Sequence, residues 1–471
     1  MNDLELIIPF KKEKIDFETF CKVIEGTVVH GPKSMKIFHL ANRINHVINP
    51  YTAIFLENKR KTIRQERIRS NTPCAIVFEK DQLIDEFLPN VTYIEVKDME
   101  KSHWSFVRHY RQMYEIPVFA ITGTCGKTTV KEMIAHILRG KYNVEATKKS
   151  RNGPHRNLGY LCGITEETDV AVFETPVDNP GLLEYNCKYF QPTIGMITNI
   201  GVDHLELCGT VENYIKAKGE IIKGLGYKGT LILNADDEKT KKISLANNKG
   251  KLIYFGVQTP ADYQASDIDF VPNGMEFTLN YQHLKYKVFV PGYGEHQVYN
   301  ALSAIAAVHQ MGFGISEAIE QLKSFINLAN HLETVIGYNR SMIIDDTWKS
   351  NPTSIEACLK VLEKIGSDKK RIAVIGSSSW LGDKESDIHR EIGEMISNYR
   401  VDTLIAYGTF ANKIAEGAKV MEGEVLTCAT SDDLEKLLVP ILNQDTALLL
   451  KTCMRDKSIK KLVSMLKNNP K

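Results

Sequence analysis

PVFAITGTCGKTTVKEMIAHIL, residues 117–138, is the stretch that decides the fold class. Its first part is an apolar, β-prone run that ends in glycine, and its last part has the apolar spacing of an amphipathic helix. A strand, a glycine-rich turn and a helix in this order are typical of a phosphate-binding loop. Glycines let backbone N–H groups turn toward phosphate oxygens, and the helix adds the positive end of its dipole.

Two side chains of this loop carry the expected chemistry. Lys127 would reach the β- and γ-phosphates of a nucleotide, and the Thr128 hydroxyl would hold Mg²⁺. Ile121 stands where the general P-loop pattern has its first glycine, so the sequence matches that pattern only in part. The position of the motif between a predicted strand and a predicted helix strengthens the assignment. The alternative is a glycine-rich turn without nucleotide. The predicted nucleotide-contacting residues are Gly123, Thr124, Cys125, Gly126, Lys127, Thr128 and Thr129, with Cys125 as a tolerated loop residue rather than a nucleophile.

Strand-like runs continue on both sides of the loop. In the centre they lie at 169–175, 193–200 and 230–235, with helical patterns between them, which predicts a parallel sheet covered on both faces. An alternating pattern over 256–292 predicts an antiparallel excursion, and 296–312 predicts a helix that stops at glycine.

Both ends of the chain also have α/β character. Four apolar runs (341–346, 371–377, 402–408 and 447–452) predict a smaller nucleotide-binding-type sheet, and the first 115 residues predict strands at 74–80 and 91–96 with a short helix at 81–88. We therefore predict an α/β protein of three domains, in keeping with 471 residues at about 150 per domain. These are a small mixed α/β domain (1–115), a central P-loop parallel-sheet domain (116–329) and a C-terminal Rossmann-like domain (330–471).

The composition narrows the class of partner. Lys and Arg number 59 and Asp and Glu 58, so the net charge is only +1. A chain this close to neutral is not expected to bind nucleic acid through its overall charge. No apolar run approaches the roughly 18 residues of a membrane span, and the N-terminus lacks the order of a signal peptide. The nine cysteines contain no CxxC pair, which argues against a zinc ribbon and fits reduced thiols in the cytoplasm. A basic segment at 59–69 is either a solvated helix face or an anion-binding edge.

The loop GTCGKTT resembles that of the Mur ligase family, which are ATP-dependent carboxylate–amine ligases of three domains. Two further blocks, 198–221 (TNIGVDHLELCGTVENYIKAKGEI) and 291–307 (PGYGEHQVYNALSAIAA), resemble family segments in the same order. IIDDTWKSNPTSIEACL (343–359) and SSWLGDKESDIHREIGEMI (378–396) resemble segments of its MurF-type branch. The resemblance covers residues 116–471. The first 115 residues resemble the family only in their general mixture of short strand-like runs and polar segments.

The resemblance implies a site with two Mg²⁺ ions and ATP. Thr128, Glu174, His204 and a carbamylated Lys218 would hold the metal, and Lys127, His204 and Lys218 would be catalytic. Hard cations prefer oxygen ligands, which a carbamate provides. Asn300 would meet the adenine and Asp346 the ribose or phosphates, and His331, in the segment opening the third domain, joins the ATP-binding set. For the anionic acceptor, the candidates in the loop SRNGPHRNLG (150–159) are Arg151, His155, Arg156 and Asn157, unless this loop is ordinary solvated surface.

The implied reaction joins two small molecules. A carboxylate attacks the γ-phosphate of ATP, and an amine then attacks the acyl phosphate, adding an amino acid or a dipeptide such as D-Ala-D-Ala to an acceptor such as a UDP-muramyl peptide. The expected protein is a cytoplasmic monomer of cell-wall synthesis that binds neither nucleic acid nor membrane.

Departures from the family pattern leave two alternatives. Glu295 and Gln297 replace the Arg and Asn of its GRHN segment, Trp348 and Lys349 replace a Tyr-Asn pair, and the N-terminal pieces that accompany a UDP-sugar are missing. The absence of an Arg in residues 330–333 is a further departure. One alternative is therefore a ligase of a pathway outside peptidoglycan. The other is a non-catalytic ATP-binding sensor or scaffold.

Overall fold

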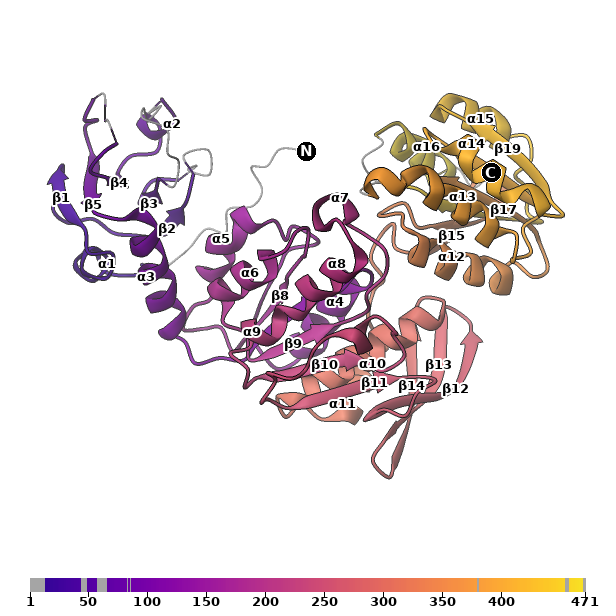
Figure 1. Cartoon of the computed structure of the whole chain (residues 1–471), viewed down its shortest axis with the longest axis horizontal. Coiled ribbons are helices and arrows are strands. Elements are labelled where there is room, and N and C mark those ends of the chain that lie inside the picture. Colours follow the sequence, from indigo (N-terminus) through magenta and orange to yellow (C-terminus); the bar gives the residue numbers. More distant parts are fainter. Residues whose placement is uncertain are drawn as a thin grey trace. The chain divides into compact units, whose positions relative to one another are not determined.

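The structure is a computed structural model that describes residues 13–43, 49–56, 66–82, 84, 86–378, 381–453 and 457–468. It contains three α/β domains built on sheets of five, nine and six strands (Figure 1). By their contacts, the residues form two compact units. One holds residues up to 120 with 141–175 and 184–193, and the other holds 121–140, 176–183 and 194 onward.

The first sheet is the core of the N-terminal domain and has the order β1-β5-β4-β3-β2. Its β1 is antiparallel to β5, and the remaining neighbours are parallel. Phe20, Phe55 and Phe106 are buried between sheet and helices with ring centroids 5.6–5.8 Å apart. The elements are α1 Phe17–Val23, β1 Thr27–His30, β2 His39–Ala41, β3 Thr52–Phe55, α2 Glu66–Arg69, β4 Cys74–Glu79, β5 Val91–Val96 and α3 Met99–Gln112.

Two predictions for this domain have different outcomes. The strands predicted at 74–80 and 91–96 are confirmed as β4 and β5, but the helix predicted at 81–88 is wrong for the described residues of that segment. The Gln82 side chain instead accepts from Glu79 N at 3.0 Å, at the end of β4. The Tyr93 hydroxyl accepts from Leu88 N at 2.9 Å and so takes the place of a helical hydrogen bond there. The basic segment 59–69 lies largely outside the described residues.

The second sheet contains the phosphate loop, which follows β6. Its order is β14-β13-β12-β11-β10-β9-β6-β8-β7, and all five residues of β6 are buried, as expected for an inner strand covered on both faces. The elements are β6 Val118–Thr122, α4 Lys127–Arg139, β7 Val144–Ala146, α5 Asn157–Leu161, β8 Val170–Glu174, α6 Leu182–Phe190, β9 Ile194–Ile197, α7 Leu205–Cys208, α8 Val211–Gly219, α9 Ile221–Gly224, β10 Thr230–Asn234, β11 Leu252–Gly256, β12 Tyr263–Val271, β13 Gly274–Tyr281, β14 Leu284–Pro291, α10 Glu295–Gln310 and α11 Ile315–Leu322.

The predicted antiparallel excursion is confirmed and extends this same sheet. β13 pairs antiparallel with both β12 and β14, and β12 joins the parallel part of the sheet by pairing with β11. The predicted helix is α10, which packs along α4 and the strands from β10 to β14. The strand β11 was not predicted from the sequence. Its first residues are alternately half-buried and buried, but lysines and glycines stand on either side of this short run and obscure the pattern.

The third sheet has the order β15-β16-β20-β17-β18-β19, with only the β15–β16 pair antiparallel. The four predicted strands are confirmed as β16, β17, β18 and β20. The elements are β15 Glu333–Ile336, β16 Met342–Asp345, α12 Pro352–Ile365, β17 Lys370–Gly376, α13 Glu385–Ile396, β18 Thr403–Tyr407, α14 Ala411–Gly417, β19 Glu424–Cys428, α15 Ser431–Leu438, β20 Thr446–Lys451 and α16 Lys457–Asn468.

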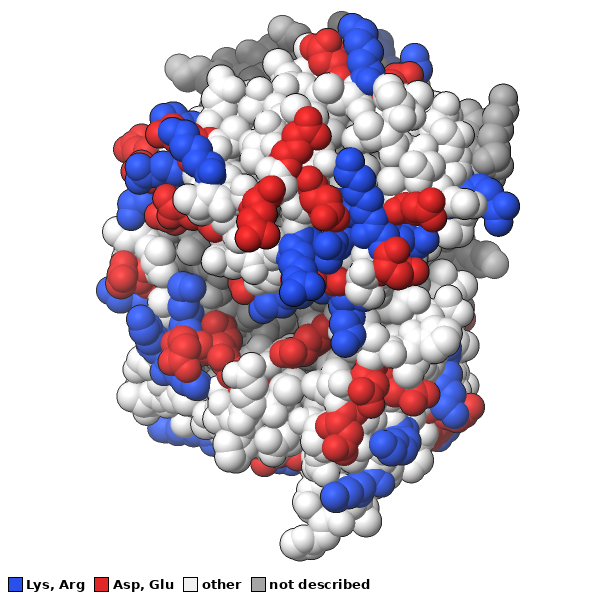
Figure 2. Space-filling model, turned by 90° about the vertical axis from the view of Figure 1, so that its right-hand side faces the viewer, with Lys and Arg blue, Asp and Glu red and all other residues white. Residues whose placement is uncertain are grey.

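Charges of both signs are interspersed on the face shown in Figure 2, in agreement with a net charge of +1. Among the described residues, no helix combines the length and the apolar character that crossing a membrane requires.

Asp236 links α10, the helix that carries Asn300, to the central sheet through hydrogen bonds. Its carboxylate accepts from Val257 N at 2.6 Å, Thr259 N at 2.6 Å and the Tyr299 hydroxyl at 2.8 Å. Burial opposes ionisation, but the hydrogen bonds from Val257, Gln258 and Thr259 outweigh it and lower the pKa of Asp236 from 3.8 to about 2. The carboxylate thus joins β10, the turn after β11 and α10.

We expect Asp236→Asn to lower the free energy of unfolding by about 1–2 kcal/mol at pH 7, because charge-assisted hydrogen bonds are lost. Since the pKa is lowered in the folded state, the stabilisation is complete above pH 3.8 and disappears as the pH falls through about 2. Urea unfolding at pH 7 and pH 3 measures this, with Asp269→Asn on the exposed side of β12 as the control. A loss of the same size at both pH values would contradict the assignment.

Candidate active site

The phosphate loop follows β6 and requires two of its glycines. Gly126, which precedes α4, has φ +80°, and a Cβ there would lie 2.6 Å from Asn300 Oδ1. Gly123 has φ +148°, and a Cβ would lie 1.9 Å from Thr198 Oγ1. Only glycine combines these backbone angles with such close neighbours. The loop and Asn300, predicted separately from sequence, therefore lie side by side.

The segment after β9 forms hydrogen bonds to Thr124 and Cys125 of this loop. Asn199 accepts from Thr124 N through its carbonyl oxygen at 2.9 Å and from Cys125 N through Oδ1 at 3.0 Å. The Thr198 hydroxyl donates to Cys125 O at 2.6 Å, and Gly201 N donates to Thr124 Oγ1 at 2.8 Å. The loop is therefore held in shape before any ligand arrives, which lowers the cost of ordering it on binding.

Two lysines meet at the loop. Lys127 Nζ, at the start of α4, donates to Gly123 O at 2.9 Å and to Thr124 O at 3.2 Å. Lys218 Nζ reaches in from α8 and donates to Thr122 Oγ1 at 3.2 Å and to Gly123 O at 2.9 Å. Lys218 is 1% exposed, and burial together with the nearby charge of Lys127 lowers its pKa well below the usual range. This shift favours the neutral, nucleophilic form of the amine.

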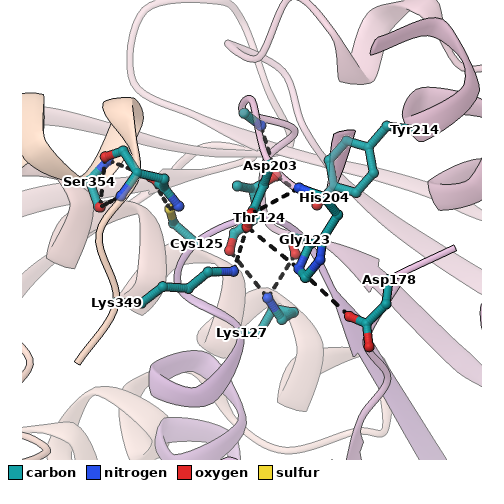
Figure 3. Close-up of polar contacts among 12 residues, drawn as sticks. Gly123, Thr124, Cys125, Lys127, Asp178, Asp203, His204, Tyr214, Lys349 and Ser354 are labelled. Carbon is teal, nitrogen blue, oxygen red and sulfur yellow. Dashed lines mark hydrogen bonds and ion pairs between the residues drawn. The ribbon is translucent and has the colours of Figure 1, made fainter. Parts of the chain in front are cut away.

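His204 lies beside these lysines between two carboxylates, as Figure 3 shows. Its Nε2 is 3.6 Å from Asp178 Oδ1 and 3.7 Å from Asp203 Oδ2. Burial lowers the pKa of His204 to about 4, against the opposing effect of Asp203. Burial alone would raise the pKa of Asp203, but Lys349, His204 and Lys127 keep it below its usual value. The imidazole is therefore neutral at pH 7 and available as a ligand.

The C-terminal domain contributes three residues that contact this region. Lys349 Nζ donates to Asp203 Oδ2, and the Asn351 side chain lies 3.5–3.6 Å from Cys125 Sγ. Thr353 lies so close to Gly201 that a Cβ on that glycine would be 2.6 Å from Thr353 Oγ1. The turn between β16 and α12 thus lies against both the phosphate loop and the segment that carries His204.

Asp346 is buried beneath that turn. It accepts from Lys451 Nζ at 2.6 Å, from Cys358 Sγ at 2.9 Å and from Leu332 N at 3.3 Å. Burial favours its protonation, but Lys451 keeps the pKa of Asp346 below its usual value. Its neighbour in the predicted ATP-binding set, His331, stacks on Trp348 with ring centroids 5.1 Å apart.

Thr128 and Thr129 follow Lys127 in the first turn of α4. The predicted residues Glu174, Arg151, His155, Arg156 and Asn157 belong to the other compact unit. Glu174 ends β8, is buried, and its Oε1 accepts from Asn152 Nδ2 at 2.8 Å. Asn157 is buried and donates to Asn186 Oδ1 at 2.7 Å, so its amide already serves the packing of α5 against α6. The other members of that loop (Arg151, His155 and Arg156) are half-buried.

The donor set fits a nucleotide with Mg²⁺ rather than a metal held by protein alone. Among the described residues, no group of three or more His, Cys, Asp and Glu side chains is arranged to hold a metal ion. Mg²⁺ in nucleotide sites typically takes one or two protein ligands with phosphate oxygens and water. Lys127 at the glycine cradle provides positive charge of the kind that a polyphosphate requires.

Sequence reasoning missed several residues that the fold brings to this site. Asp203 stands next to His204 in DHLE, a signal that could have identified it, and Asn199 lies earlier in the same block, residues 198–221. Asp178 and Lys349 had no local signal, because they reach the site only through the packing of distant segments.

Fold and site together define a P-loop α/β enzyme that acts on a nucleotide. The Mur ligase middle domain profile matches residues 121–308, and the profile described as Mur ligase, glutamate ligase domain matches residues 332–452. The chain therefore belongs to the Mur ligase family and is an ATP-dependent ligase that forms amide bonds, with ATP and Mg²⁺ as the family's cofactors.

Three relatives illustrate the similarity. The chain is 31% identical to UDP-N-acetylmuramoyl-tripeptide–D-alanyl-D-alanine ligase of Bacillus subtilis over 70% of this chain and 71% of that protein. It is 30% identical to the enzyme of the same name from Haemophilus influenzae, over 75% and 76%. The crystal structure of MurF from Acinetobacter baumannii superposes with a TM-score of 0.85 at 22% identity, covering 97% of this chain and 99% of that one, which shows a MurF-like fold.

Proposed function

We propose that this enzyme is a MurF-like ligase that adds an amino acid or a dipeptide such as D-Ala-D-Ala to the carboxylate of an acceptor such as a UDP-muramyl peptide. The observation that carries the proposal is the meeting of Lys127, Lys218 and the Asp203–His204 pair at the phosphate loop. The names of the relatives from Bacillus subtilis and Haemophilus influenzae support the choice of substrates.

The proposed reaction proceeds in two steps. An oxygen of the acceptor carboxylate attacks the γ-phosphorus of ATP, the bond to the β-phosphate oxygen breaks, and ADP leaves with the electron pair. The amine nitrogen then attacks the acyl carbon, phosphate leaves, and the nitrogen loses a proton to give the amide. Lys127 and the N-terminus of α4 stabilise the negative charge that gathers on the transferred group.

Bound Mg²⁺ supplies charge neutralisation for the phosphates. We propose that Thr128, Glu174, His204 and Lys218 hold two such ions, with Lys218 as a carbamate. Burial of the amine supports this, because it lowers the pKa of Lys218 and so favours the neutral form. A neutral amine nitrogen forms a bond to the carbon of CO₂ and releases one proton. The product is an anionic oxygen ligand, which suits Mg²⁺ better than an amine.

We also propose that the other predicted residues contact the substrates. Gly123 to Thr129 would contact the phosphates and Asn300 the adenine. Asn300 is oriented by its donation to Gln297 Oε1 at 2.8 Å. His331 and Asp346 complete the proposed ATP-binding set. In the loop before α5 we propose Arg151, His155, Arg156 and Asn157 as contacts of the acceptor.

A second candidate is a ligase of the same chemistry with other substrates. It is favoured by the residues that depart from the family pattern at the site, because Trp348 stacks on His331 and Lys349 pairs with Asp203. Such substitutions alter the surroundings of the reacting groups while the phosphate loop is unchanged.

Release of ADP and phosphate tests the proposal. We expect turnover with UDP-muramyl tripeptide and D-Ala-D-Ala only when both are present, and micromolar binding of the tripeptide by calorimetry. Each substrate omitted in turn provides the control. Turnover with other acids and amines, without binding of the muramyl peptide, would favour the second candidate. No ADP with any pair of acids and amines would refute the ligase assignment.

A further inference from the structure

Lys349 is a cation that the C-terminal domain places at the phosphate loop. Its Nζ donates to Asp203 Oδ2, and Figure 3 shows the side chain pointing from the turn before α12 toward the cluster of Lys127, His204 and Asp203. The pair joins residues 146 positions apart in the chain. It is therefore a tertiary contact that local folding does not provide.

Asp203, the acceptor of this ion pair, is shielded from solvent. Asp203 is 1% exposed, its Oδ1 accepts from His204 N at 3.1 Å, and its Oδ2 faces His204 Nε2 at 3.7 Å. A buried carboxylate needs a cation and hydrogen bonds to remain ionised. Lys349 supplies that cation, and the segment it stabilises is the one that carries His204.

The backbone that carries Lys349 is itself anchored. Lys451 Nζ donates both to Asp346 Oδ2 at 2.6 Å and to Lys349 O at 2.5 Å, and both side chains are buried. On the other side, Asn351 caps α12 through Ser354 N at 2.9 Å. Lys349 therefore projects from a turn held at both ends, so its head group is delivered to Asp203 with little freedom to move.

Two lysines, Lys127 and Lys349, bring positive charge to the site. Lys127 and Lys349 both act on Asp203 and His204, and the carboxylates that face His204 are Asp203 and the half-exposed Asp178. Lys127 and Lys218 both donate to Gly123 O, so they converge on one point of the loop. A phosphate at that point of the loop would therefore lie beside the charge of Lys127.

We propose that Lys349 is a positioning residue for phosphoryl transfer, which acts through Asp203 to hold the His204 segment and to couple the C-terminal domain to the nucleotide at the loop. The proposal rests on the ligase function proposed above and adds a residue where the family pattern has another. It predicts that loss of the Lys349 charge lowers the rate of the chemical step rather than the affinity for ATP.

Four variants test the role in the full-length enzyme. We expect Lys349→Met to reduce kcat about tenfold or more with KM for ATP changed less than about threefold, as for an interaction that matters in the transition state. Lys349→Arg restores at least half of kcat, since it keeps the charge. Asp203→Asn combined with Lys349→Met gives a neutral pair that regains thermal stability but not kcat. Lys360→Met, an exposed lysine of α12 paired with Glu356, serves as the matched control.

A merely structural pair predicts different results. Recovery of kcat together with stability in the double variant would overturn the proposal, as would wild-type kcat in Lys349→Met. An equal loss in Lys360→Met would also refute it.

A second readout does not depend on turnover. A non-hydrolysable ATP analogue is expected to slow hydrogen exchange in residues 347–351 of the wild type but not of Lys349→Met. An effect of the same size in both proteins overturns the coupling. If the wild type binds the analogue with this protection but makes no product with any substrate pair, the ligase function fails while the coupling stands.

Discussion

Lys127→Ala is expected to abolish ATP turnover, with a loss on the order of a thousandfold, while the protein stays folded. The Nζ of Lys127 lies against the two loop carbonyls at Gly123 and Thr124, which places its charge where the terminal phosphates would be bound. Groups that stabilise charge developing in the transition state contribute on the order of a hundred- to a thousandfold each. The measurement is ADP formation with saturating carboxylate and amine, alongside circular dichroism.

The matched control is Arg139→Ala, at the exposed far end of the same helix. It removes a cation from α4 without approaching the loop, so wild-type turnover is expected. Turnover by Lys127→Ala at more than a tenth of the wild-type rate would place the phosphate site elsewhere in the chain.

Lys218→Met is expected to abolish ligation, and Lys218→Ala to do so with partial recovery when formate or acetate is added. The lysine is buried against the Tyr214 ring, with its Nζ 4.9 Å from the ring centroid, so methionine retains the packing and alanine leaves a space that a small carboxylate fits. If the functional form is a carbamate, the added acid replaces its oxygens. The measurement is product formation over a range of acid concentrations.

Lys216→Ala provides the control, because Lys216 lies on the exposed side of α8, two residues away. It should retain full activity with no response to added acid. Rescue by chloride as large as that by formate would refute the carbamate. Nucleotide binding by Lys218→Ala with unchanged ligation would remove Lys218 from the site, and the absence of turnover even in the wild type would favour the sensor alternative.

The reach of sequence reasoning is clearest in the phosphate loop. Strand, glycine turn and helix follow one another within 22 residues, so periodicity and glycine placement predicted β6, the loop and α4 together. The same reasoning failed at 81–88, where Gln82 and Tyr93 form hydrogen bonds that compete with a helix. It also missed the short strands β1, β2, β3 and β7, whose three or four residues are too few to show a period.

Sequence by itself determined the α/β class, the phosphate loop and the family, because each depends on residues close together in the chain or on motifs in a given order. Tertiary structure alone decided which side chains share the site. Asn199 reaches Cys125 across 74 positions and Lys349 reaches Asp203 across 146. The lowered pKa of Lys218 is likewise a property of burial and neighbouring charge. Electric fields and desolvation act through space, so they exist only once distant segments have packed together.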